Sequence, residues 1–142
     1  MLKTKMYFAY GANISKSAMS YRCPTARPVQ SFDLRGWELE LFNHATVRRA
    51  KGKTVPGVLW EITADDELAL DAFEGFPYYY VKQTVTQGDK TFFFYVMNEG
   101  REGYPSRGYV SGIEEGYQQW GIPTHALERA INNVNERLHT ER

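Results

Sequence analysis

Residues 5–15 read Lys5-Met6-Tyr7-Phe8-Ala9-Tyr10-Gly11-Ala12-Asn13-Ile14-Ser15. The first six are short, rich in aromatics and stop at a glycine, which predicts a strand over residues 5–10. Gly11, Ala12 and Asn13 then form a turn, and Ser15 can cap a short helix that runs to about Tyr21. A strand that turns directly into a helix leaves backbone N–H groups exposed, and these favour an anion. The alternative is an ordinary turn with Tyr10 in the core.

The rest of the chain is predicted as runs of strands and helices. Because the strands do not alternate with long helices, an α+β fold is favoured over a doubly wound one. The tyrosines at 78–80 should alternate along a strand, so Tyr79 is expected to face away from its neighbours. The predicted strands cover residues 31–34, 37–42, 55–62, 79–85 and 91–97. The predicted helices are capped by Thr63, capped by Ser106 and opened by Pro123, and residues 43–54 are predicted as a basic, polar loop.

Length and composition narrow the classes of protein. The chain has 142 residues, which fits one domain over residues 1–142 with a core of about 5–138. Lys plus Arg and Asp plus Glu are both 17, so the net charge of zero argues against a nucleic-acid or anionic-lipid partner. No apolar run is long enough to span a bilayer, and the start lacks a signal peptide, so we expect a cytoplasmic protein. One cysteine and three scattered histidines predict neither a disulfide framework nor a metal site.

Glu74 is the candidate acid–base residue. It follows the apolar side of a helix and precedes the aromatic run Phe76-Pro77-Tyr78-Tyr79-Tyr80. A carboxyl group surrounded by apolar and aromatic side chains loses contact with water. This loss raises its pKa toward the range that suits proton transfer at neutral pH. A glutamate is also poorly placed at a helix C-terminus, where the dipole repels it. By composition alone, an exposed glutamate at a helix end is an equally good interpretation.

Four segments of the chain resemble the motifs of a known family, and they occur in the same order as in that family. They are Tyr7-Phe8-Ala9-Tyr10-Gly11-Ala12-Asn13-Ile14-Ser15, Val55-Pro56-Gly57-Val58-Leu59-Trp60-Glu61-Ile62, Leu70-Asp71-Ala72-Phe73-Glu74-Gly75 followed by Tyr80-Val81, and Ser106 to Tyr109. Together they resemble the γ-glutamylcyclotransferase-like family, which includes the AIG2-like proteins. The family motif has a serine where this chain has Ala12. If the family uses mainly the backbone N–H at that position, alanine is harmless. If the serine hydroxyl contacts the substrate, its absence affects specificity or activity.

The resemblance implies a fold and an activity. It implies a small mixed β-barrel flanked by helices, and a cyclotransferase that needs no cofactor and no metal. The substrate would be a γ-glutamyl amide, whose α-amine attacks its own γ-carbonyl to release 5-oxoproline and a free amine. The matching positions make Glu74 the general acid–base residue. They make the turn from Tyr10 through Gly11 and Ala12 to Asn13 the seat of the α-carboxylate, and they place Tyr80 and Tyr109 near the pocket.

Several alternatives are compatible with the sequence. The leaving amine could belong to a γ-glutamylamine or to a γ-glutamyl-protected intermediate of antibiotic assembly, both of which occur in the wider family. The basic residues Arg48, Arg49, Lys51 and Lys53 could meet the acidic end of a substrate such as glutathione, although a solvated loop is the better interpretation. The chain could also be a non-catalytic binding module, or an interaction protein that uses surface aromatics. The sequence leaves the oligomeric state open.

Overall fold

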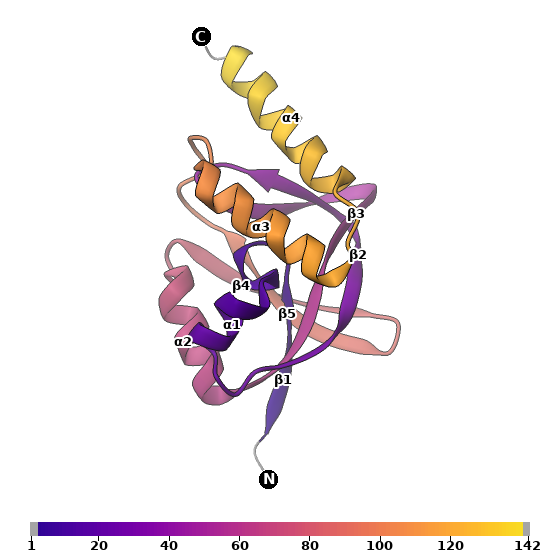
Figure 1. The fold of residues 1–142 in the computed structure, drawn as a ribbon, viewed down its shortest axis with the longest axis vertical. Helices are drawn as coiled ribbons and strands as arrows, with labels where there is room; N and C mark the ends of the chain where they lie inside the picture. Colours follow the sequence, from indigo (N-terminus) through magenta and orange to yellow (C-terminus); the bar gives the residue numbers. More distant parts are fainter. Residues whose placement is uncertain (1–2, 141–142) are drawn as a thin grey trace.

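Five strands form one mixed sheet in the order β2-β3-β1-β5-β4, with helices packed around it (Figure 1). The structure is a computed structural model, which describes residues 3–140. The elements in chain order are β1 (Thr4–Ala9), the 3₁₀ turn η1 (Ala12–Ile14), α1 (Lys16–Arg22), β2 (Arg27–Leu41), β3 (Ala45–Thr63), α2 (Ala64–Glu74), β4 (Tyr80–Gln87), β5 (Lys90–Met97), α3 (Arg107–Trp120) and α4 (His125–Thr140).

The central strand is β1, which confirms the strand predicted near the start of the chain. It pairs antiparallel with β3 from Thr4↔Thr63 to Ala9↔Val58, and parallel with β5 at Tyr7↔Phe93. Its second half is buried, and Phe8 is fully enclosed. Because β1 ends inside the core, the turn that follows it begins at a buried position.

Residues 45–54 are not the predicted loop but the first half of β3, which pairs with β2 along a hairpin. The basic residues are accommodated by cross-strand pairing, which a single strand's sequence does not reveal. Arg48 lies opposite Glu38, and its Nη2 is 2.6 Å from Glu38 Oε1. The guanidinium of Arg49 lies 4.9 Å from the centre of the Trp37 ring. Charged and aromatic partners on the neighbouring strand thus keep a polar stretch in the sheet.

The α+β class is confirmed, but the sheet does not close into the barrel that the resemblance implied. No backbone pairing joins the edge strands β2 and β4 within residues 3–140. A single side chain bridges them instead. The Arg35 N–H donates to Gln87 Oε1 at 3.0 Å, and Gln87 Nε2 donates to the Asp33 carbonyl at 2.8 Å. The two edges are therefore held together by an amide side chain in place of a ladder.

Local capping signals fix the ends of the helices. Ser15 and Ser106 accept from the backbone of α1 and α3, and Thr63 forms a capping box with Asp66 at the start of α2. Gly75 ends α2 in the left-handed conformation. The last helix begins at His125, two residues after Pro123. No helix of residues 3–140 is long and apolar enough to cross a membrane.

The helices lie on different parts of the sheet. In Figure 1, α1 and α2 lie side by side near β1, and α4 projects at the end opposite the N-terminus. The helix α3 packs against η1, and Trp120 Nε1 donates to the Ile14 carbonyl at 3.1 Å. The turn after β1 is therefore held between the sheet and α3.

Gly57 leaves no room for a side chain where β3 crosses β1. A Cβ there would overlap the Ala9 carbonyl oxygen and lie 2.7 Å from Phe8 Cζ. We therefore expect Gly57→Ala to lower the free energy of unfolding by about 1–3 kcal/mol, through overpacking. Chemical denaturation would measure this change.

The matched control is Gly112→Ala in α3, where a new Cβ meets nothing within 4 Å. This substitution should raise stability by about 0.5–1 kcal/mol, because alanine is the better helix former. Equal effects at the two glycines would contradict the packing described for β1 and β3.

Candidate active site

A cavity of about 140 Å³ opens where β1 ends. The structure places around it every residue predicted for the site. Six further residues line the same cavity without having been predicted. The predicted seven are Tyr10, Gly11, Ala12, Asn13, Glu74, Tyr80 and Tyr109, and the others are Tyr7, His44, Ala45, Phe73, Tyr79 and Tyr95.

Glu74 is the last residue of α2, and it lines the cavity. Burial raises its pKa from an ordinary value of 4.5 to about 7, although the positive charge of Arg22 opposes the shift. No hydrogen bond to this carboxyl is formed by any other described residue. The group is therefore partly desolvated and unpaired, and it can hold or release a proton near neutral pH.

The residues of the turn after β1 line the same cavity. The N–H of Ile14 donates to the Gly11 carbonyl at 3.1 Å, which closes the 3₁₀ turn. The N–H groups of Ala12 and Asn13 precede this bond, and neither has an acceptor within residues 3–140. Both residues line the cavity, so these donors are available at its wall.

The side chain of Asn13 is buried, and its hydrogen bonds connect it to neighbouring residues, so its amide is not free to donate to a ligand. Its Nδ2 donates to the Tyr7 hydroxyl at 3.0 Å, and its Oδ1 accepts from Arg22 Nη1. The Arg22 guanidinium also lies 3.4 Å from the centre of the Phe73 ring, next to Glu74. Arg22 was not predicted as a site residue, because its approach to Glu74 depends on the packing of α1 against α2.

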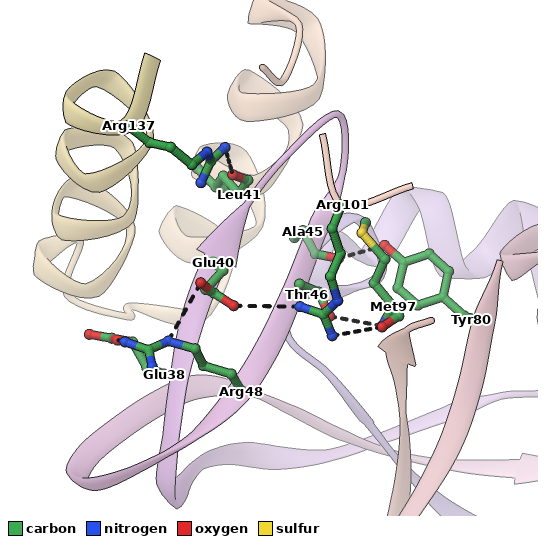
Figure 2. A network of polar contacts seen from close by, with 10 residues as sticks. All are labelled: Glu38, Glu40, Leu41, Ala45, Thr46, Arg48, Tyr80, Met97, Arg101 and Arg137. Atoms are coloured by element: carbon green, nitrogen blue, oxygen red, sulfur yellow. Dashed lines mark hydrogen bonds and ion pairs between the residues drawn. The ribbon is translucent and has the colours of Figure 1, made fainter. Parts of the chain in front are cut away.

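Two tyrosine hydroxyls form hydrogen bonds with the backbone of Ala45. The Tyr80 hydroxyl donates to the Ala45 carbonyl at 2.5 Å, as Figure 2 shows. The Ala45 N–H donates to the Tyr109 hydroxyl at 3.0 Å. Tyr109 therefore keeps its own proton available for another acceptor, and burial raises its pKa to about 12, so that the hydroxyl stays protonated. The proton of Tyr10 is committed, since its hydroxyl donates to the Tyr95 carbonyl at 2.7 Å.

The prediction that Tyr79 faces away from its neighbours is wrong. The strand β4 begins at Tyr80, so Tyr79 belongs to the preceding turn and is not subject to strand alternation. Its ring lies 5.2 Å from that of Tyr80, and both line the cavity. His44 also reaches the cavity, and its Nδ1 lies 3.1 Å from the Tyr79 hydroxyl. His44 is isolated in sequence, so only the tertiary structure reveals this pairing.

The basic residues that could have met the acidic end of a substrate belong to β3. Neither Arg48 nor Arg49 nor the two nearby lysines, Lys51 and Lys53, lines the cavity. The first two are engaged with β2, as described above. Within residues 3–140, no group of three or more His, Cys, Asp or Glu side chains is arranged to hold a metal ion.

The raised pKa of Glu74 predicts how stability depends on pH. Between pH 4.5 and about 7 the folded state binds more protons than the unfolded chain, so the free energy of unfolding falls as pH rises. Glu74→Gln removes this dependence. From pH 4.5 to about 7, the free energy of unfolding of the variant should rise relative to that of the wild type by on the order of 2 kcal/mol. This figure allows for the partial exposure of the Glu74 carboxyl to solvent. Denaturation midpoints at a series of pH values would measure the gain, and parallel curves would contradict it.

Comparison with known proteins places the chain among its relatives. A family model described as gamma-glutamyl cyclotransferase, AIG2-like, matches residues 7–118. An uncharacterized human protein (loc79017) is 28% identical with a TM-score of 0.78, over 89% of this chain and 86% of that one. A solved structure named gamma-glutamyl cyclotransferase is 26% identical with a TM-score of 0.77, over 90% and 86%. YkqA from Bacillus subtilis, at 21% identity and a TM-score of 0.72 over 92% of this chain and 55% of that one, shares the fold. No curated protein matches the chain significantly.

The family match covers most of the chain, and it includes the end of β1, the turn after it, Glu74 and Tyr109. The chain therefore belongs to the gamma-glutamyl cyclotransferase, AIG2-like family.

Proposed function

We propose that this chain is an amide-cleaving cyclotransferase that converts a γ-glutamyl amide into 5-oxoproline and a free amine. The observation that carries the proposal is the unpaired carboxyl group of Glu74. It lies in the same small cavity as the unpartnered N–H groups of Ala12 and Asn13. A proton-transfer group and an anion seat in one cavity are what such a substrate requires.

The reaction needs one bond made and one broken. The α-amine nitrogen of the substrate attacks its own γ-carbonyl carbon, and the five-membered ring closes. Glu74 accepts a proton from the attacking nitrogen and then delivers it to the leaving nitrogen as the amide C–N bond breaks. No water is consumed, and the leaving amine departs neutral. Because the attack is intramolecular, holding one conformer of the substrate supplies much of the rate enhancement.

The turn and the tyrosines would orient the substrate for this attack. The α-carboxylate would bind the N–H groups of Ala12 and Asn13, which places the α-amine toward the interior of the cavity. Tyr109 retains a hydroxyl proton that it can donate to the oxygen of the γ-carbonyl as negative charge develops there. Tyr80 would act indirectly, since it holds the backbone of Ala45 and therefore the position of Tyr109.

One observation bears on the leaving amine. The four basic residues that could have met the acidic end of glutathione do not line the cavity. This favours a γ-glutamylamine over a substrate whose leaving group carries carboxylates. An intermediate of antibiotic assembly with an amine leaving group is compatible with the same cavity. A binding module without activity would not need the unpaired carboxyl of Glu74.

Replacing Glu74 tests the reaction. We expect Glu74→Gln to lower kcat by about 10²- to 10⁴-fold, because the amide cannot carry the proton between the two nitrogens. In the wild type, kcat/KM should rise with pH through about 7, since Glu74 must be ionised to accept the proton. The assay is release of 5-oxoproline, detected by mass spectrometry, from a panel of γ-glutamyl amino acids, γ-glutamylamines and glutathione.

Asp65→Asn provides the matched control, because Asp65 is exposed at the opposite end of the same helix and does not line the cavity. Its turnover should equal that of the wild type. Full activity in Glu74→Gln would refute the proposed role. Binding of 5-oxoproline without turnover of any panel member would favour the non-catalytic module.

The position that departs from the family motif supplies a separate test. If the backbone N–H of residue 12 holds the carboxylate, restoring the hydroxyl with Ala12→Ser should change kcat/KM by less than about threefold. A gain of tenfold or more, roughly 1.4 kcal/mol in transition-state binding, would mean instead that the hydroxyl itself contacts substrate.

A further inference from the structure

The cavity has a closed end and an open end. Tyr7, Tyr10 and Asn13 form the closed end, and each is at most 7% exposed. Phe73 is 48% exposed, and His44 is exposed as well, so these residues mark the open end. A substrate whose glutamyl group occupies the closed end must direct its amine through the open end.

Two aromatic side chains from different parts of the chain meet at this opening, and we call His44 and Tyr79 the mouth pair. His44 follows β2, and Tyr79 precedes β4. The Nδ1 of His44 lies 3.1 Å from the Tyr79 hydroxyl, and the two rings meet edge to face at 5.9 Å. The His44 ring also packs edge to face on Tyr109, at 5.2 Å. The mouth pair is thus continuous with the proposed donor Tyr109.

The segment 98–102 supports both members of the mouth pair. The N–H groups of Asn98 and Glu99 donate to the Tyr79 carbonyl at 2.8 and 3.3 Å. On the other side, the Asn43 N–H donates to the Glu102 carbonyl at 2.9 Å, immediately before His44. The segment therefore connects the two backbones that carry the pair.

Gly100 lies directly beneath the Tyr79 ring. Its φ of +74° favours glycine, and an added Cβ would overlap Tyr79 Cε1 and lie 3.1 Å from Cζ. Any side chain at residue 100 would therefore push the Tyr79 ring away from its place.

Arg101 ties the segment to the sheet. Its Nη2 donates to the Met97 carbonyl at 2.7 Å, and its Nη1 lies 3.7 Å from Glu40 Oε1. Figure 2 shows the guanidinium between these two partners, beside the Thr46 hydroxyl that accepts from the Met97 N–H. The support of the mouth pair is thus anchored to both β2 and β5.

We propose that the mouth pair contacts the leaving amine and selects an apolar or aromatic amine, with segment 98–102 holding it in place. The surfaces offered at the opening are aromatic rings. The negative charge of Glu102, which contributes to the raised pKa of Tyr79, also disfavours a carboxylate there. The proposal rests on the cyclotransferase function. It adds that recognition of the leaving group is separable from recognition of the glutamyl group.

Two synthetic substrates distinguish the ends of the cavity: γ-glutamylmethylamide, whose leaving group is too short to reach the mouth, and γ-glutamylbenzylamide. The wild type should prefer the benzylamide. Tyr79→Ala should lower kcat/KM for the benzylamide by about 3- to 10-fold, mainly through KM, and should leave the methylamide within about twofold. Gly100→Ala should shift the same ratio in the same direction, although residue 100 touches no substrate.

Tyr78→Ala is the matched control, because Tyr78 is 78% exposed and does not line the cavity. It should leave the substrate ratio unchanged. Tyr79→Phe keeps the ring and removes only the contact with His44, so it should give a smaller shift and serves if the alanine variant does not fold. An unchanged ratio in every Tyr79 and Gly100 variant that folds would overturn the proposal.

Affinity for 5-oxoproline separates this proposal from the function on which it rests. The product lacks the leaving group, so Tyr79→Ala should bind it as the wild type does, by calorimetry. Weaker binding by about tenfold would show that Tyr79 reaches the glutamyl end, which overturns the assignment. A wild type that binds 5-oxoproline but cleaves neither amide would refute the cyclotransferase function, and the mouth-pair proposal would fall with it.

Discussion

The geometry of the site depends on the two hydrogen bonds of the buried Asn13 side-chain amide. The amide donates to Tyr7 in the central strand and accepts from Arg22 at the end of α1. Both hydrogen-bonding ends of the amide are therefore used, as a buried amide requires. Through this one side chain, the strand, the turn after it and the helix α1 are fixed relative to one another.

The same contact shapes the electrostatics of Glu74. Arg22 is the charged group that opposes the effect of burial on the Glu74 pKa. Because Asn13 and the ring of Phe73 hold the guanidinium, Arg22 influences Glu74 without forming an ion pair with it. A direct salt bridge would keep the carboxyl ionised well below neutral pH. Restraining the positive charge a short distance away leaves a carboxyl group that can change protonation state.

Much of the fold could be predicted from the sequence because its signals are local. Ser15, Thr63 and Ser106 each cap the helix that directly follows them, and the structure confirms all three caps. The prediction of a loop over residues 45–54 is wrong, because these basic residues form a strand only through pairing with β2, which lies elsewhere in the sequence. The seven expected site residues could be named in advance because they lie in segments that resemble the family, and all seven line one cavity. His44, Tyr79 and Arg22 carry no motif, and only packing brings them to the site.

The side chain of Gln87 has a consequence for the edges of the sheet. An edge strand presents unpaired N–H and C=O groups on which another chain can add a strand, and this is a common route to aggregation. On β2, Gln87 occupies the carbonyl of Asp33 and the N–H of Arg35. The register of β2 also shifts just after Arg35, next to Gly36. One glutamine thus makes two backbone groups of the β2 edge unavailable to a strand from another molecule, at the point where the strand is also irregular.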